Sequence, residues 1–197
     1  MLVQAAMALW RTNGYAETTV AQICAAAGVS KALFYFYFPR KEDVLFEVGV
    51  LSTRQAQRVI AAGLERPGYD ITALIADALA SLEKSMRANP AELVIETILE
   101  GYRHEHRILA GHPGGPPPDL DGGMFSALFT RAVADGTLPP GTDAGHLAYL
   151  AMTLVSEGAR HWAAGAFGDR SFAEVVGADI TTLIAGVRHT HNRQGSS

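Results

Sequence analysis

A short stretch near the N-terminus carries the start and stop signals of two helices joined by a tight turn. Thr19 and Gln22 have the spacing of a capping box, which satisfies two backbone donors at the start of a helix. Apolar residues then recur on one helical face, at Val20, Ile23, Cys24 and Ala27. Gly28 can take the left-handed conformation that ends a helix, and Ser30 is a good N-cap for the next one. The sequence therefore predicts a helix-turn-helix whose second helix covers about residues 31–37.

This second helix is rich in aromatic residues. Positions 34–37 are four consecutive aromatics, and Phe38 adds a fifth. Phe34 and Phe38 share one helical face, whereas Ala32 and Phe36 point away from it. A helix of this length cannot bury so many rings, so some of them must face solvent or a partner. In a helix-turn-helix the outward face of this helix contacts DNA, and the alternative is a helical hairpin with an over-rich core.

With these elements in place, the chain resembles the TetR family of bacterial transcriptional repressors. The shared elements are a Thr-rich helix start at 18–20, the Ala-Gly-Val-Ser-Lys turn at 27–31, an aromatic recognition helix at 33–38, and Pro39, Lys41 and Glu42 opening the next helix. Upstream, the family's first helix and its Gly-aromatic ending are matched by Ala5, Ala6, Leu9, Trp10, Gly14 and Tyr15. The resemblance covers about the first 48 residues.

The resemblance implies an all-α protein of about nine helices in two domains. Residues 1–45 would form a three-helix DNA-binding domain, and residues 46–197 a helical domain for ligand binding and dimerisation. The expected protein is a ligand-responsive bacterial repressor that binds a palindromic operator as a homodimer and is released by a small, largely apolar molecule. Two recognition helices about one DNA turn apart would read such an inverted repeat.

The expected contacts with double-stranded operator DNA come from the second helix and its flanks. They are Thr19, Ser30, Lys31, Ala32, Leu33, Tyr35, Phe36, Tyr37 and Lys41. No outward residue of the helix is an Arg, Asn or Gln able to form a bidentate bond to a base edge. We therefore expect Ala32, Leu33 or Phe36 to contact thymine methyl groups, and the Tyr35 hydroxyl to contact bases. The family pattern places Thr19, Tyr37 and Lys41 on phosphates.

The chain departs from the family pattern at several positions of this module. Ala32 and Leu33 stand where the family often has Gly-Thr, and Phe36 stands where it often has His or Arg. Arg40 takes the position of the usual Ser or Asn cap.

Charge adds only weak support for DNA binding. Residues 1–45 carry four basic and three acidic side chains, while the whole chain has a formal net charge of −4. So weakly basic a module predicts few phosphate contacts and a shallow salt dependence. No basic segment precedes the first predicted helix, so either the start is incomplete or contacts from a minor-groove arm are absent.

Length and composition indicate a cytoplasmic protein with no membrane segment. The chain has 197 residues and is 48% hydrophobic, yet it contains no apolar run long enough for a membrane span and no signal peptide. Its single cysteine, Cys24, excludes an internal disulfide. Because Cys24 shares the apolar face of its helix, we interpret it as a packing residue and not as a reactive thiol.

The pattern after residue 45 is helical almost throughout. The expected helices cover about 41–65, 71–88, 91–110, 124–135, 143–166 and 171–187. Between the third and fourth of these lies a loop rich in Gly and Pro, residues 111–123, which lacks the Gly-Lys-Thr or Gly-Lys-Ser ending of a phosphate-binding loop.

In the family the final two helices pair with their copies in a second subunit. The matching apolar stripes, which predict a dimer interface, are Leu147, Leu150, Ala151, Leu154, Val155, Gly158, Val176, Ile180, Leu183, Ile184 and Val187. Small residues such as Ala151 and Gly158 would allow helices to approach closely. Core packing within one subunit explains the same stripes equally well.

A helical bundle can enclose a mostly apolar ligand cavity with a few polar groups. Candidate lining residues are Met86, Glu100, Tyr102, His104, Phe125, Phe129, Tyr149, Met152 and Trp162. For the apolar members, ordinary core packing is the simpler interpretation. Glu96, Glu100 and His104 recur every four residues, which favours a solvated helix face over a metal site.

Two other classes of protein compete with a DNA-binding regulator. An enzyme is disfavoured because no nucleophile elbow, metal-binding helix or nucleotide loop organises the histidines and carboxylates, so we predict no catalytic residues, metal or cofactor. The second is a helical small-molecule-binding or adaptor protein whose DNA module is weak or inactive. Salt-sensitive binding to duplex DNA would separate the regulator from this adaptor.

Overall fold

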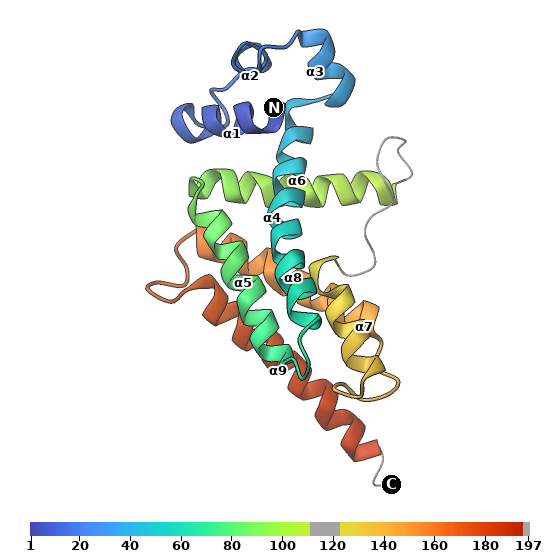
Figure 1. The fold of residues 1–197 in the computed structure, drawn as a ribbon. Coiled ribbons are helices and arrows are strands. Elements are labelled where there is room, and N and C mark those ends of the chain that lie inside the picture. Colours follow the sequence, from blue (N-terminus) through green and yellow to red (C-terminus); the bar gives the residue numbers. More distant parts are fainter. Residues whose placement is uncertain (111–122, 195–197) are drawn as a thin grey trace. The chain divides into compact units, whose positions relative to one another are not determined.

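The computed structural model describes residues 1–110 and 123–194, and every regular element in these ranges is helical. The elements follow one another as α1 (Leu2–Asn13), α2 (Val20–Ala27), α3 (Lys31–Tyr37), α4 (Lys41–Leu64), α5 (Ile71–Arg87), α6 (Ala91–Leu109), η1 (Gly123–Phe125), α7 (Ser126–Ala134), α8 (Ala144–Ala163) and α9 (Phe172–Gln194) (Figure 1). The all-α expectation is confirmed. Of the predicted Gly- and Pro-rich loop, residues 111–122 lie outside the described residues.

The predicted helix-turn-helix is present with the expected end signals. Thr19 and Gln22 form a capping box in which each side chain satisfies a backbone N–H of the other residue. Gly28 ends α2 in the left-handed conformation, with φ at 66° and ψ at 33°. The Ser30 hydroxyl accepts the Leu33 N–H at 3.1 Å and so caps α3. The two helices enclose an angle of 103°, within the range of helix-turn-helix motifs.

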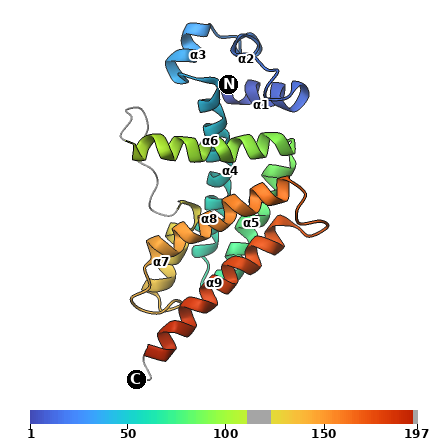
Figure 2. The same cartoon turned by 180° about the vertical axis from the view of Figure 1, so that it is seen from behind.

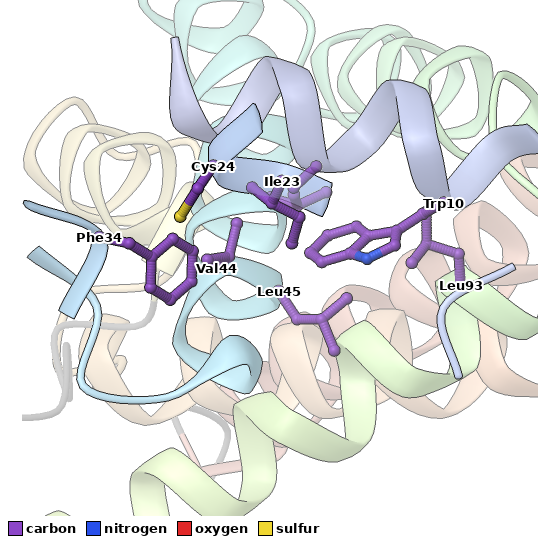
Figure 3. Close-up of a cluster of buried hydrophobic side chains, with 9 residues drawn as sticks. Trp10, Ile23, Cys24, Phe34, Val44, Leu45 and Leu93 are labelled. Carbon is purple, nitrogen blue, oxygen red and sulfur yellow. The ribbon is translucent and has the colours of Figure 1, made fainter. Parts of the chain in front are cut away.

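One apolar cluster holds α1 to α4 together (Figure 3). Its buried members are Ala6, Trp10, Ile23, Cys24, Phe34, Val44, Leu45, Val48 and Leu93. Cys24 is buried among apolar side chains, as a packing residue should be. Leu93 comes from α6, so a helix outside the predicted DNA-binding domain completes the core of that domain.

The chain forms two compact units whose boundaries cut across the predicted domains. The first unit, here called the reading unit, comprises Met1–Ser52 together with the described part of Met86–Gly115, and so includes α6. The second comprises Thr53–Ser85 with the described part of Pro116–Ser197. The division falls inside α4, which is continuous from Lys41 to Leu64.

In the second unit α8 packs against η1, α7 and α9. Figure 2 shows α8 and α9 side by side, and α5 is tied to the start of α9 because Glu83 accepts the Ala173 N–H at 3.0 Å. The α8–α9 contact is close at Gly158, where an added Cβ would lie 2.3 Å from Cγ2 of the buried Val176. The absence of a side chain at Gly158 therefore allows α8 and α9 of one chain to pack closely.

Helix boundaries lie within about three residues of the predictions except at the C-terminal end of α9. The helix expected from residue 124 opens with the 3₁₀ turn η1 before α7 starts at Ser126. Helix α9 continues to Gln194, several residues past the expected end at Val187. No single helix in the described ranges is long and apolar enough to cross a membrane; α2 and α3 reach that composition only as a pair, which is sharply bent.

We predict that Gly158→Ala lowers the free energy of unfolding by about 1–3 kcal/mol, because a methyl group at this position would overlap a β-branched side chain fixed in the core. Chemical denaturation followed by circular dichroism measures the change.

Gly177→Ala in α9 is the matched control, since its added Cβ would meet only Leu79 Cδ1 at 3.6 Å. This control should be neutral or stabilising by up to about 1 kcal/mol through higher helix propensity. Equal effects of the two substitutions would contradict the proposed close contact at Gly158.

Candidate nucleic-acid interface

Helix α3 presents nearly all of its side chains to solvent. Phe34 is fully buried, whereas Phe36 is 78% exposed, Tyr37 62% and Tyr35 51%. The prediction that some of the aromatic rings must face outward is confirmed. Phe34 is the buried residue of α3, and the other three rings of the helix are exposed to solvent.

The predicted DNA-contacting residues all lie on the reading unit, and most of them are exposed. Ser30, Lys31, Ala32, Leu33, Tyr35, Phe36 and Tyr37 are exposed on α3 or at its start, and Thr19 is exposed at the start of α2. Two of the hydroxyls already have a structural task. Thr19 and Ser30 each accept a backbone N–H as helix caps. The Thr19 hydroxyl also donates to Gln22 Oε1 at 2.9 Å, so a phosphate contact from Thr19 would replace this hydrogen bond.

Lys41 is half-buried and holds the turn between α1 and α2. Its ammonium donates to the carbonyls of Tyr15 at 3.0 Å and Thr18 at 3.1 Å, and it lies 4.2 Å from the centre of the Tyr15 ring. The Tyr15 hydroxyl in turn donates to Glu42 at 3.3 Å. Burial and the neighbouring Glu42 carboxylate raise the pKa of Tyr15 well above its usual range. Lys41 thus keeps one N–H for a phosphate, which remains the predicted contact.

A charged cluster that sequence reasoning did not find lies directly after the recognition helix. We name it the Glu100 cluster and define it as Arg40, Asp43, Glu100, Arg103 and Arg107. Glu100 on α6 has a fully buried side chain. Its Oε1 accepts from Arg40 at 2.8 Å and from Arg107 at 2.7 Å. Asp43 accepts from both the Arg40 guanidinium and the Arg40 backbone N–H.

The arginines keep Glu100 ionised despite its burial. Burial alone would raise the pKa of Glu100, but the hydrogen bonds from Arg107 and Arg40 lower it below its ordinary value. A carboxyl group with a lowered pKa in the folded state stabilises the fold above its ordinary pKa and loses this contribution as the pH falls. At neutral pH the Glu100 cluster is therefore a network of charged groups.

The expectation that Glu96, Glu100 and His104 form a solvated face is wrong for Glu100, whose side chain is inaccessible to solvent. His104 is partly buried and its ring stacks on Phe46 of α4, with centroids 3.9 Å apart. Burial and the charge of Arg107 lower the pKa of His104. Within residues 1–110 and 123–189, no three His, Cys, Asp or Glu side chains are placed to hold a metal ion.

The predicted ligand-contacting residues are divided between the two compact units. Met86, Glu100, Tyr102 and His104 belong to the reading unit, and Phe125, Phe129, Tyr149, Met152 and Trp162 belong to the other. Glu100 is occupied by its arginine partners, and both tyrosines are exposed. Phe125 and Phe129 are fully buried and stack on each other, with centroids 5.8 Å apart.

Most residues of the predicted dimer interface are buried within the single chain. These are Leu147, Ala151, Val155, Gly158, Val176, Ile180 and Ile184. Leu150, Leu154, Leu183 and Val187 are partly exposed. The stripes therefore serve core packing within the subunit to a large extent, and only the partly exposed members are accessible to a second copy.

Comparison with known proteins identifies the N-terminal module. A family model described as bacterial regulatory proteins, tetR family, matches residues 2–48. The match spans α1, α2, α3 and the first two turns of α4. A search of curated proteins gives no significant match.

Solved structures of similar fold span nearly the whole chain. FadR of Thermus thermophilus, a TetR family transcriptional repressor solved in complex with lauroyl-CoA, is 23% identical with a TM-score of 0.68, covering 93% of this chain and 91% of that chain. FadR of Bacillus subtilis, in complex with stearoyl-CoA, is 19% identical with a TM-score of 0.63, covering 94% and 97%. GusR of Salmonella enterica is 21% identical with a TM-score of 0.58, covering 93% of each chain. At these identities the likeness shows the shared fold.

We predict that Lys41→Met lowers the free energy of unfolding by about 1–2 kcal/mol, because two partly buried carbonyls lose a charged donor. Urea denaturation measures this change. Lys31→Met, on the exposed start of α3, is the control and should change stability by less than about 0.5 kcal/mol. Equal stability of wild type and Lys41→Met would show that water replaces the ammonium at no cost.

Proposed function

We propose that the chain is a TetR family transcriptional regulator, which represses transcription by binding a palindromic operator as a homodimer. The observation that carries this proposal is the exposure of the apolar side chains of α3. The helix is capped at its start, and Phe34 is its one buried residue. A soluble protein rarely leaves such a surface exposed without a binding partner. The major groove of DNA accepts a helix of this kind.

The chemistry of α3 favours recognition of thymine. Its exposed side chains offer methyl groups and rings at Ala32, Leu33 and Phe36, which complement the C5-methyl group of thymine. The hydroxyls of Tyr35 and Tyr37 provide hydrogen bonds to base edges or phosphates. Specificity in this proposal comes mainly from apolar contact, because α3 contains no Arg, Asn or Gln, and Lys31 at its first position is its one basic side chain.

Dimerisation follows from the small size of this reading surface. A single seven-residue helix offers too few contacts with DNA for tight specific binding. Two symmetry-related helices in one dimer double these contacts, while the dimer loses its translational and rotational freedom only once on binding. The partly exposed Leu150, Leu154, Leu183 and Val187 support α8 and α9 as the dimer contact. Their buried neighbours hold the two helices of each subunit in register.

The proposed effector is a small, largely apolar molecule. Long-chain acyl-CoA thioesters, which join an apolar acyl chain to a larger, anionic coenzyme A group, are a second class to test. The FadR proteins of similar fold were solved with lauroyl-CoA and stearoyl-CoA, which supports this choice. A ligand releases DNA only through different affinities for the two states of the protein. A coupling of about 1–3 kcal/mol would weaken operator binding by about 5- to 150-fold.

Selection of bound fragments from a random duplex library tests the proposed DNA recognition. We expect enrichment of an inverted repeat with thymine-rich half-sites spaced by about one helical turn. Enrichment of an uninterrupted single half-site would contradict the dimeric mode. Binding without enrichment, lost as salt is raised, would instead favour the ligand-binding or adaptor protein with a weak DNA module.

Operator release tests the ligand class. Lauroyl-CoA and stearoyl-CoA should each weaken binding to the selected operator, whereas coenzyme A alone should not. Fluorescence anisotropy of labelled operator measures the affinity with and without each compound. If acyl-CoA binds, as seen by calorimetry, but leaves the operator affinity unchanged, this class of effector is wrong.

We predict that Phe36→Ala changes the sequence preference of the protein without unfolding it. The side chain is 78% exposed, so stability should change by less than about 0.5 kcal/mol. The enriched operator should lose its preference at one thymine position per half-site, equivalent to about 1–3 kcal/mol of discrimination. Repeating the duplex selection with the variant measures this loss.

Leu51→Ala is the matched control, because Leu51 is an exposed apolar residue of α4 that lies outside the recognition helix. Its selected operator should equal that of the wild type. An unchanged operator for Phe36→Ala would show that Phe36 does not face the bases.

A further inference from the structure

Glu100 is a buried carboxylate that touches the segment immediately following the recognition helix. Its Oε1 accepts from Arg40 and Arg107, and Arg107 also lies 4.0 Å from Asp43. Arg40, Glu100, Arg107 and Asp43 therefore form a closed ring of alternating charge. Arg103 stands outside this ring, with its Nη1 3.6 Å from Glu100 Oε2.

Arg40 connects this ring to α3 over a very short path. Helix α3 ends at Tyr37, and only Phe38 and Pro39 separate it from Arg40. The ring of Pro39 restricts the backbone before Arg40. The Arg40 backbone N–H donates to the Asp43 carboxylate at 2.9 Å. A displacement of Arg40 would therefore move the backbone at the C-terminal end of α3.

The ring is one part of a row of contacts between α6 and the rest of the reading unit, which we call the seam. Along α6 the contacting residues are Leu93, Thr97, Glu100, His104 and Arg107, which recur at intervals of three and four and so share one helical face. Leu93 enters the apolar core, and His104 stacks on Phe46. Thr97 lies so close to Gly49 that an added Cβ there would be 3.1 Å from Thr97 Cγ2.

Figure 1 shows α6 lying across the first half of α4. Among the residues of this seam, only those of the Glu100 cluster reach from α6 to the segment that follows α3. The other contacts fix α6 to α1 and to the body of α4. The Glu100 cluster is thus the contact by which α6 reaches the segment that follows α3.

We propose that Glu100 is a positioning residue for DNA recognition, which sets the orientation of α3 through Arg40. The proposal rests on the proposed function as an operator-binding regulator. Removing the Glu100 charge leaves three arginines facing one carboxylate, so Arg40 is repelled from α6 and α3 samples several orientations. Apparent operator affinity falls by the fraction of molecules in the binding orientation.

The test compares Glu100→Gln, Arg40→Gln and the double variant in binding to the operator selected by the wild type. Each single variant should weaken specific binding by about tenfold, and the double variant should be no weaker than Glu100→Gln alone, because both substitutions break one interaction. Binding to random duplex at low salt should change by less than about twofold, since phosphate contacts remain.

The salt dependence separates positioning from direct contact with DNA. If Arg40 bound a phosphate, Arg40→Gln would flatten the plot of log affinity against log salt by about one unit per subunit. A positioning role leaves that slope equal to the wild-type slope. Arg40 is 41% exposed, so Arg40→Gln tests the proposal even if Glu100→Gln does not fold.

Arg131→Gln is the matched control, because Arg131 is 60% exposed, lies 3.6 Å from the carboxylate of Asp135 and belongs to α7, outside the Glu100 cluster. It should leave operator affinity within about twofold of the wild type. The proposal is overturned if Glu100→Gln or Arg40→Gln folds and binds the operator with wild-type affinity. Lower thermal stability of such a variant would then show that the cluster has a structural role only. Failure of the wild type to select any operator would instead overturn the proposed function.

Discussion

The reading surface depends on the burial of Phe34. This ring is the only fully buried side chain of the seven-residue helix α3, and it fixes the helix against Ile23, Cys24 and Val44 in the core. Burial of a phenylalanine side chain contributes about 2–3 kcal/mol, which is a large share for so short a helix. Because one ring supplies the attachment and Ser30 supplies the cap, the other aromatic rings of α3 are free to face outward.

The core around Phe34 is completed from outside the three-helix module. Leu93 of α6 belongs to the same cluster as Trp10, and Arg11 of α1 donates to Asn89, which precedes α6, at 3.0 Å. Helix α6 therefore belongs physically to the reading unit, although the sequence places it far from the recognition helix. Any event that moves α6 acts on this core and on the Glu100 cluster together, which gives the proposed regulator a direct route from α6 to α3.

The features predicted correctly from sequence are those with local causes. The capping box at Thr19, the left-handed Gly28 and the outward rings of α3 follow from neighbouring residues and helical geometry. The role of Glu100 was missed because its partner Arg40 is sixty residues away, and four-residue spacing fits a buried face as well as a solvated one. Gly158 likewise gave no sign of whether it meets a second subunit or Val176 of its own chain. Tertiary contacts decide such positions.

The internal use of basic side chains shapes how this protein can bind DNA. Residues 1–45 contain four basic residues, of which Lys41 donates to two carbonyls, Arg40 pairs with two carboxylates and Arg11 donates to Asn89. Lys31, exposed at the start of α3, is the remaining one. The electrostatic part of DNA binding is therefore smaller than the charge count indicates. In the proposed function, affinity would then come mainly from the fit of the exposed aromatic side chains of α3 to the groove. A well-defined orientation of α3 would therefore matter more than in a strongly basic DNA-binding protein.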